Sequence, residues 1–210
     1  MVFHKLYILC IKEKNIMKRL FDVFFSILGL IILFPILLIV SILVKTSSKG
    51  PLFFIQERVG KEGVLFKIIK FRTMFVVKDH DSSISIKGDN RITKLGFFLR
   101  RYKLDELPQL INVLTGEMSF VGPRPDVPGY ADKLIGNDRD ILKLRPGITG
   151  PASLRYSNEE YILAQQEDPI SYNNNVIYPE KVKINLDYYN NNSIWLDIKI
   201  IFATIFKNFY

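Results

Sequence analysis

Two adjacent carboxylates, Asp105 and Glu106, begin the stretch of this sequence whose residue types are best suited to chemistry. Arg100 lies shortly before them, and a proline-rich turn that carries Arg124 ends the stretch. Paired acids among arginines suit a metal-bound phosphate better than a carbohydrate or a peptide, because guanidinium groups bind phosphate oxygens well. The alternative is a surface helix with a capping acid and ordinary counter-ions, which is a common arrangement.

The residues that follow the acid pair predict the element that positions it. Apolar side chains recur at helical spacing from residue 107 to residue 114, and Gly116 offers an end to the helix. Asp105 suits the N-cap, and Pro108 fits the first turn, where its missing N–H costs little. A carboxylate at that end of a helix tends to stay ionised.

Composition limits the classes of function. The 210 residues carry a net charge of +8, which favours nucleic acid, anionic lipid or phosphorylated substrates as partners. A hydrophobic content of 48% argues against a disordered basic tail and for a membrane element. Cys10 is the single cysteine, so an internal disulfide and a zinc site of several cysteines are excluded, and His4 and His80 lie too far apart in sequence for the spacing of a metal pair.

Residues 23–44 form an uncharged segment long enough, as a helix, to match a hydrocarbon core. Pro35 lies within it and should kink the helix. Both flanks are basic, with Lys18 and Arg19 before and Lys45 after, so the positive-inside rule places both ends in the cytoplasm. A helix that bends at Pro35 and leaves on the side it entered satisfies that rule, whereas a kinked spanning helix stays the more common alternative.

The rest of the chain predicts an α/β (α+β) fold that is mostly helical. Residues 52–56 and 64–71 read as two strands joined in a hairpin by a turn at 60–63. Further elements are a loop at 78–90, helices at 92–102 and 132–144, a rigid turn at 146–151, and mixed helix and loop at 156–178.

The C-terminal segment, residues 195–209, is amphipathic. Its apolar stripe includes Trp195, Phe202, Ile205 and Phe209, against a polar side that includes Asp197. Two interpretations are equally good from the sequence: a terminal helix that packs this stripe in the core, and a helix that lies at a membrane interface.

Ordered blocks of sequence resemble a known family. They are KRLFD at 18–22, QERVG at 56–60, KFRTM at 70–74, LDELPQL at 104–110, NVLTGEMSFVGPRP at 112–125, RPGITG at 145–150 and WLDIKII at 195–201. Together they resemble the bacterial sugar transferases that act as small monotopic phosphoglycosyl transferases. The resemblance runs from about residue 18 to residue 207, and the ordered set is far more specific than any single block.

The resemblance implies a reaction and a topology. Members transfer a sugar phosphate from a UDP-sugar to polyprenyl phosphate (undecaprenyl phosphate) in the cytoplasmic leaflet and release UMP. It implies a re-entrant membrane helix at 18–45, after an N-terminal extension at 1–17, and a cytosolic catalytic domain at 46–210 with interfacial helices. The expected location is the cytoplasmic face of the bacterial inner membrane. Many relatives have a serine before the proline of the bend, where this chain has Phe34, so Pro35 must bend the helix alone.

The resemblance also implies roles for residues. Asp105 matches the nucleophile of the family's Asp-Glu dyad and would bind Mg²⁺ together with the diphosphate, while Glu106 would stabilise the site. The substrate phosphates would be bound by basic residues: Lys70, Arg100, Arg124, Arg145 and Arg155. Arg155 stands out of register with the arginine that many relatives have after the RPGITG block.

Two other classes of function remain open from the sequence. A membrane-anchored nucleic-acid binder would explain the charge, but the aromatic residues are interleaved with apolar residues rather than with basic ones, so no nucleic-acid partner is expected. A catalytically inactive scaffold of a polysaccharide assembly complex would keep the fold, although the intact pair of Asp105 and Glu106 argues against it. The sequence identifies neither the sugar nor the oligomeric state.

Overall fold

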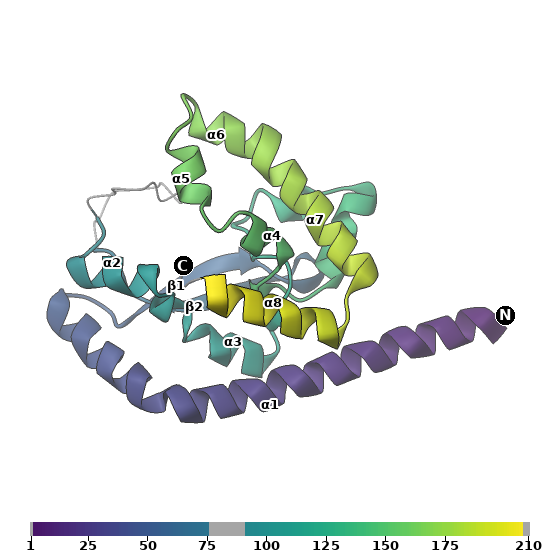
Figure 1. Ribbon diagram of the computed structural model, residues 1–210, viewed down its shortest axis with the longest axis horizontal. Coiled ribbons are helices and arrows are strands. Elements are labelled where there is room, and N and C mark those ends of the chain that lie inside the picture. The colour runs from purple at the N-terminus through teal and green to yellow at the C-terminus, as the bar shows by residue number, and fades with distance from the viewer. Residues whose placement is uncertain (1, 76–90, 208–210) are drawn as a thin grey trace.

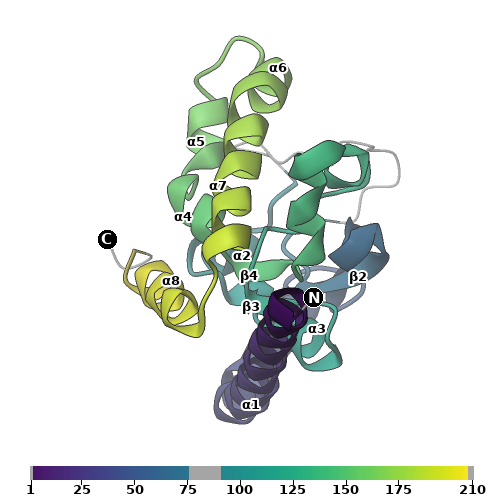
Figure 2. The same ribbon diagram turned by 90° about the vertical axis from the view of Figure 1, so that its right-hand side faces the viewer.

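The computed structural model describes residues 2–75 and 91–207, with side chains from residue 16 onward. Helices predominate over short strands, as Figure 1 shows, and the mostly helical fold is confirmed. The predicted loop at 78–90 with His80, and Phe209, lie outside the described residues, as do the side chains of His4 and Cys10. In Figures 1 and 2, helices α5 (Glu159–Leu163), α6 (Pro169–Tyr172) and α7 (Tyr178–Asn191) lie on the side of the molecule opposite the long helix α1 (Val2–Ser47).

Helix α1 (Val2–Ser47) is the longest element and contains Pro35. Figure 1 shows it running along one side of the molecule and bending in its C-terminal part. Its 32 residues from Ile16 to Ser47 are long and apolar enough to cross a membrane, and only 11% of the most apolar window is buried. Exposed side chains such as Ile31 and Phe34 therefore need an apolar environment outside the chain.

The N-terminal part of this apolar helix has one polar side, and that side holds it to the domain. The Lys18 ammonium forms an ion pair with Asp197, and the Tyr188 hydroxyl donates to the same carboxylate. Asp22, which is 1% exposed, accepts bonds of 3.1 Å from the Ser119 hydroxyl and from the backbone N–H of Phe120. The contacts of Lys18 and Asp22 join segments about a hundred residues or more apart in sequence.

Arg19 completes the polar side by capping another helix. Its guanidinium donates to the carbonyls of Val113 (2.6 Å) and Leu114 (2.8 Å), at the C-terminal end of α3 (Gln109–Thr115). The last carbonyls of a helix have no partner within it and carry partial negative charge, so a cation stabilises them. The KRLFD block thus docks α1 on the domain.

The predicted hairpin is confirmed. Strands β1 (Phe53–Val59) and β2 (Leu65–Phe71) pair antiparallel from Phe53 opposite Phe71 to Val59 opposite Leu65. A single 3₁₀ turn, Lys61–Gly63, joins them. Asn112 of α3 holds β2 through its side chain, which accepts from the N–H of Ile69 and donates to the carbonyl of Lys67.

The prediction of a rigid turn at 146–151 is wrong. Residues Gly147–Thr149 form strand β4, which pairs parallel with β3 (Ser119–Val121), and Pro151 begins helix α4 (Pro151–Arg155). The strands can approach because glycines face each other: a Cβ on Gly147 would lie 2.2 Å from the backbone N of Gly122. Glycine at both positions permits a backbone contact that no side chain would tolerate.

The remaining helices surround these sheets. They are α2 (Lys94–Arg101), the 3₁₀ turns Leu104–Glu106, Ala131–Lys133 and Gly136–Lys143, α5 (Glu159–Leu163), α6 (Pro169–Tyr172), the π-turn Asn173–Ile177, α7 (Tyr178–Asn191) and α8 (Ile194–Lys207). The helix predicted at 132–144 is instead two 3₁₀ pieces, the second of which begins at Gly136 with a φ of +58°. In α2, Leu99 is buried as expected, but Phe98 is 51% exposed.

Helix α8 turns part of its apolar stripe outward. Trp195 is 77% exposed and Phe202 is 56% exposed, whereas Asp197, on the side predicted to be polar, is only 2% exposed. The ion pair with Lys18 explains this orientation, because it draws the carboxylate inward and leaves the aromatic residues outside. Each of the two interpretations holds for part of this segment. Ile200 and Ile201 pack in the core, whereas Trp195 and Phe202 stay exposed, as an interfacial helix requires.

Replacing Asp197 with Asn should destabilise the protein, because it leaves the Lys18 ammonium without its counter-charge at a site where the carboxylate is almost fully buried. Removing one partner of a buried ion pair lowers the free energy of unfolding by about 3 kcal/mol or more. Thermal unfolding in detergent measures the loss. Asp187→Asn, an exposed site on α7, is the matched control, and an equal effect of both changes would contradict the role of the ion pair.

Candidate active site

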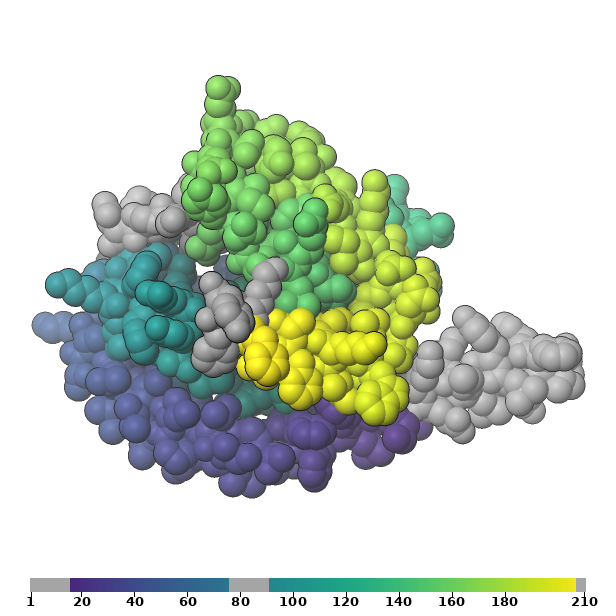
Figure 3. Space-filling view, in the orientation of Figure 1, coloured from purple at the N-terminus to yellow at the C-terminus, as the bar shows by residue number. Residues whose placement is uncertain are grey.

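A large cavity lies between the hairpin, α2 and the acid pair on one side, and α4, α5 and α7 on the other. Its volume is about 1480 Å³. The space-filling view shows the surface hollowed between α2 and the α4–α5 region (Figure 3). Its lining includes Lys70, Arg100, Asp105, Glu106 and Arg124, so the predicted acid pair and three of the predicted basic residues converge on one cavity.

The acid pair is positioned by a tight turn rather than by a helix cap. Asp105 and Glu106 belong to the 3₁₀ turn Leu104–Glu106, and Lys103 before it adopts a left-handed conformation with φ of 56°. Helix α3 begins only at Gln109, with Pro108 at its cap and no side-chain capping bond. The prediction that Asp105 caps this helix is therefore wrong, and the turn instead directs two adjacent carboxylates into the cavity.

Glu106 is fixed by two cations. Its Oε1 accepts from the Lys70 ammonium at 2.7 Å and from the Arg124 guanidinium at 2.9 Å. Burial alone would raise the pKa of Glu106, but Arg124, Lys70 and Lys103 together hold it well below its ordinary value. Burial also lowers the pKa of the Lys70 ammonium, which Glu106 partly opposes. Glu106 is therefore a permanently ionised residue that organises the basic groups around it.

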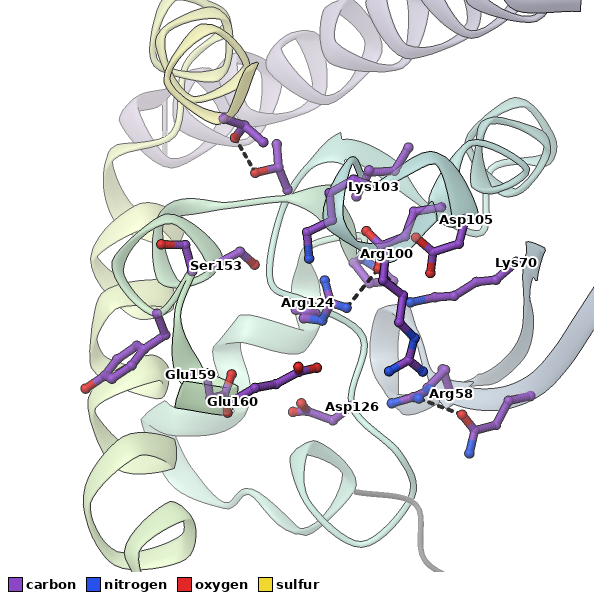
Figure 4. Close-up of a pocket in the computed structure, with 18 of the residues that line it drawn as sticks. Arg58, Lys70, Arg100, Lys103, Asp105, Arg124, Asp126, Ser153, Glu159 and Glu160 are labelled. Carbon is purple, nitrogen blue, oxygen red and sulfur yellow. Dashed lines mark hydrogen bonds and ion pairs between the residues drawn. The ribbon is translucent and has the colours of Figure 1, made fainter. Parts of the chain in front are cut away.

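Asp105 has the opposite character. It is 7% exposed, and within the described part of the chain its Oδ1 has no hydrogen-bond partner. Burial raises the pKa of Asp105, the charge of Glu106 raises it further, and Lys70, Lys103 and Arg100 oppose the shift. Figure 4 shows Asp105 directed towards Lys70 and Arg100. A buried carboxylate oxygen without a partner, close to cations, is free to act as a nucleophile or as a metal ligand.

The donor set fits a magnesium ion only in part. The described residues contain no group of three or more His, Cys, Asp or Glu side chains that could hold a metal. Mg²⁺ does not require one, because it commonly binds one or two carboxylates and completes its shell with water and substrate phosphates. The unpartnered Oδ1 of Asp105 is a hard oxygen donor of that kind.

Comparison with known proteins identifies the family. The family model described as "Bacterial sugar transferase" matches residues 13–210. The chain belongs to this family.

Curated relatives agree with the family. The chain is 44% identical over 199 residues to the UDP-glucose:undecaprenyl-phosphate glucose-1-phosphate transferase of Klebsiella pneumoniae, covering 92% of this chain and 40% of that protein. It is 40% identical to the Escherichia coli protein of the same name, covering 93% and 40%. It is 37% identical to the exopolysaccharide production protein PSS of Rhizobium leguminosarum, covering 90% and 94%. The chain thus spans about two-fifths of the first two relatives.

Two basic residues that the family resemblance suggested lie away from the acid pair. The Arg145 Nε donates to the carbonyl of Gly116 at 2.9 Å, at the C-terminal end of α3. The Arg155 side chain is 70% exposed, and its Nε lies 3.7 Å from a carboxylate oxygen of Glu180. Neither lines the cavity, so the structure does not bring them together with Lys70 and Arg124.

Other cavity residues escaped the sequence analysis. Arg58 lines the cavity from β1, and its side chain donates to Gln56 and to the carbonyl of Pro125. Asp126 follows Pro125 directly and also lines the cavity. Arg58 lies within the QERVG block and Asp126 directly follows the proline-rich turn. Their positions in the sequence did not indicate that they line the same cavity.

The acids Asp126, Glu159 and Glu160 lie together on the side of the cavity away from Asp105 (Figure 4). Burial raises the pKa of Asp126 to about 6, against lowering effects of Lys181, Tyr178 and Arg58. Glu159 is held by Lys181, whose ammonium lies 2.6 Å from the carboxylate. The cavity therefore has a basic side around the acid pair and an acidic side across from it.

The raised pKa of Asp126 predicts a pH-dependent stability. An unfolded chain releases this proton near pH 3.8, whereas the folded protein keeps it until about pH 6. The proton thus stabilises the fold fully below pH 3.8, and this contribution is lost as the pH rises through about 6. The stability of wild type relative to Asp126→Asn should therefore fall by up to about 3 kcal/mol from pH 4 to pH 7.

Thermal unfolding of both proteins across this pH range measures the difference. Asp138→Asn, at an exposed position, controls for the change in net charge. A constant difference between wild type and Asp126→Asn at every pH would contradict the assignment.

Proposed function

We propose that this chain transfers a sugar phosphate from a UDP-sugar to polyprenyl phosphate and releases UMP. The observation that carries the proposal is the unpartnered, buried oxygen of Asp105 beside a glutamate that fixes Lys70 and Arg124. The printed names of two relatives support it, because both are UDP-glucose:undecaprenyl-phosphate glucose-1-phosphate transferases. The proposal places the reaction at the first membrane step of surface glycan synthesis.

The first step forms a covalent bond to the protein. A carboxylate oxygen of Asp105 attacks the phosphorus that carries the sugar, and the bond from that phosphorus to the bridging oxygen breaks. UMP leaves with the bridging oxygen and its electron pair, and the sugar phosphate stays on Asp105. The basic side of the cavity supports this step, since Lys70, Arg100 and Arg124 offset the repulsion between a carboxylate and an anionic diphosphate.

The second step restores the carboxylate. An oxygen of polyprenyl phosphate attacks the same phosphorus, the bond to Asp105 breaks, and polyprenyl-diphosphate-sugar forms. Glu106 stays ionised throughout and keeps Lys70 and Arg124 in place. Mg²⁺, held by Asp105 and the substrate diphosphate, would supply neutralisation of the charge that develops on the leaving UMP.

We further propose that α1 is re-entrant and that the domain lies on the cytoplasmic face of the bacterial inner membrane. Both ends of the apolar segment touch the same domain: Arg19 donates to the C-terminal end of α3, and Arg72 donates to the carbonyls of Val44 and Ser48. A helix that crossed the bilayer would separate these ends by the thickness of the membrane. The exposed apolar residues of α8 suit the interface beside α1.

The covalent step predicts a protein adduct. Incubation with UDP-glucose and Mg²⁺, without polyprenyl phosphate, should give protein heavier by one glucose phosphate, located on Asp105 by mass spectrometry. Polyprenyl phosphate should then discharge the adduct. Asp105→Asn keeps the size of the side chain but removes its charge, so it should form no adduct and lower turnover by at least about a thousandfold.

Arg101 offers the control for this measurement. Arg100 and Arg101 both line the cavity, but Arg101 is exposed, whereas the Arg100 Nε donates to the Thr73 hydroxyl, so Arg101→Ala should lower turnover less than Arg100→Ala. If no adduct forms in active protein, transfer is direct and Asp105 serves only to bind metal. If no UDP-sugar yields UMP at all, the inactive scaffold becomes the correct interpretation.

The re-entrant topology predicts that both flanks of α1 face one side. Single cysteines at positions 16 and 49, after Cys10→Ser, should react with a membrane-impermeant maleimide in inverted vesicles and stay unreacted in spheroplasts. A cysteine at an exposed position of the domain, such as Asn190, controls for access. Reaction of the two flanks from opposite sides would contradict the proposal.

A further inference from the structure

The cavity contains buried polar atoms that the proposed chemistry does not use. Asn185 of α7 is 7% exposed, and Ser153 lies on α4. Both residues line the cavity, and among the described residues neither Asn185 Oδ1 nor Ser153 Oγ has a hydrogen-bond partner. Leaving a buried polar atom unsatisfied destabilises a fold by about 1–3 kcal/mol. Two such atoms in one cavity wall are therefore better explained by a ligand than by the fold.

The two atoms belong to a continuous wall. Helix α4 packs against α7, and residues Tyr178, Lys181 and Asn185 repeat along one face of α7 at helical spacing and line the cavity. Figure 4 shows Ser153 on the opposite side of the cavity from Asp105, with Arg124 between them in this view. This wall is thus part of the candidate active site but separate from the acid pair.

The chemistry of the wall favours hydroxyl groups. Asn185 Oδ1 is an acceptor, Ser153 Oγ both donates and accepts, and the adjoining side carries the carboxylates of Asp126 and Glu159. The Lys181 ammonium in this wall is already paired with Glu159, so the wall mainly offers acceptors and suits a ligand with several donors. Sugar hydroxyls each donate and accept, whereas a uracil ring offers one N–H donor and two carbonyl acceptors. A polyol therefore matches the wall better than a nucleobase or a phosphate does.

We propose that Ser153 and Asn185, with Asp126 on the adjoining side, bind hydroxyl groups of the sugar-nucleotide donor while the basic side of the cavity binds its diphosphate. The identity of the donor as a UDP-sugar rests on the proposed function. Both the hexose and the ribose of this donor carry such hydroxyl groups. Comparing the binding of UDP-glucose with that of UMP, which carries only the ribose, shows which of the two sugars contacts the wall.

The test measures binding without turnover. Asn185→Leu and Ser153→Ala are each introduced into the Asp105→Asn protein, and the affinities for UDP-glucose and UMP are measured by titration calorimetry. Loss of one or two hydrogen bonds should weaken binding of UDP-glucose by about tenfold. Unchanged affinity for UMP assigns the hydroxyls to the hexose, and an equal loss assigns them to the ribose. Asn190→Leu, at an exposed position of α7, is the control and should leave both affinities unchanged.

Thermal stability separates a binding role from a structural one. Because Asn185 Oδ1 is buried without a partner, Leu should keep or raise the melting temperature while it weakens binding. Unchanged affinities in both variants, or a lower melting temperature together with general loss of affinity, would overturn the inference. UMP release is measured separately with Asp105 intact. Absence of turnover would refute the proposed function, whereas the binding affinities test the inference about Ser153 and Asn185.

Discussion

The ion pair between Lys18 and Asp197 is the contact on which the arrangement of this protein depends. It joins the start of the apolar helix to α8 and, through Tyr188, to α7. Without a polar side that includes Asp22, the long helix α1 would have only apolar surface to offer the domain and could slide or detach. The pair also decides which side of α8 faces outward, so a charge contact sets the direction of an aromatic surface.

The acid pair shows how one turn gives two carboxylates different tasks. Glu106 is surrounded by cations and stays ionised, while Asp105 is equally buried but keeps an oxygen without a partner. The difference comes from neighbours rather than from burial, since both side chains are less than 10% exposed. A charged residue that fixes Lys70 and Arg124 leaves the adjacent carboxylate available for chemistry.

The cavity as a whole also has two electrostatically different sides. The side near Asp105 is basic and suits phosphates, and the side near Asp126 is acidic and suits hydroxyl groups. The unpartnered atoms of Ser153 and Asn185 lie on the wall away from the acid pair, where they weaken the fold unless a ligand satisfies them. Binding sites often lower the stability of a fold, because a ligand can form hydrogen bonds only with polar atoms that have no partner within the protein.

The sequence by itself predicted the long apolar helix, the hairpin and the importance of the acid pair. These features depend on periodicity, turn glycines and adjacent carboxylates, which are properties of residues close together in the chain. The sequence-based predictions failed where segments far apart in the chain contact each other. Residues 147–149 form a strand where Gly122 lies against Gly147, and Asp197 is buried where Lys18 pairs with it. Arg145, which the resemblance placed at the substrate, instead reaches a helix end, and Asn185 lines the cavity without any sequence signal. Side chains far apart in sequence acquire a common task only when the fold brings them together.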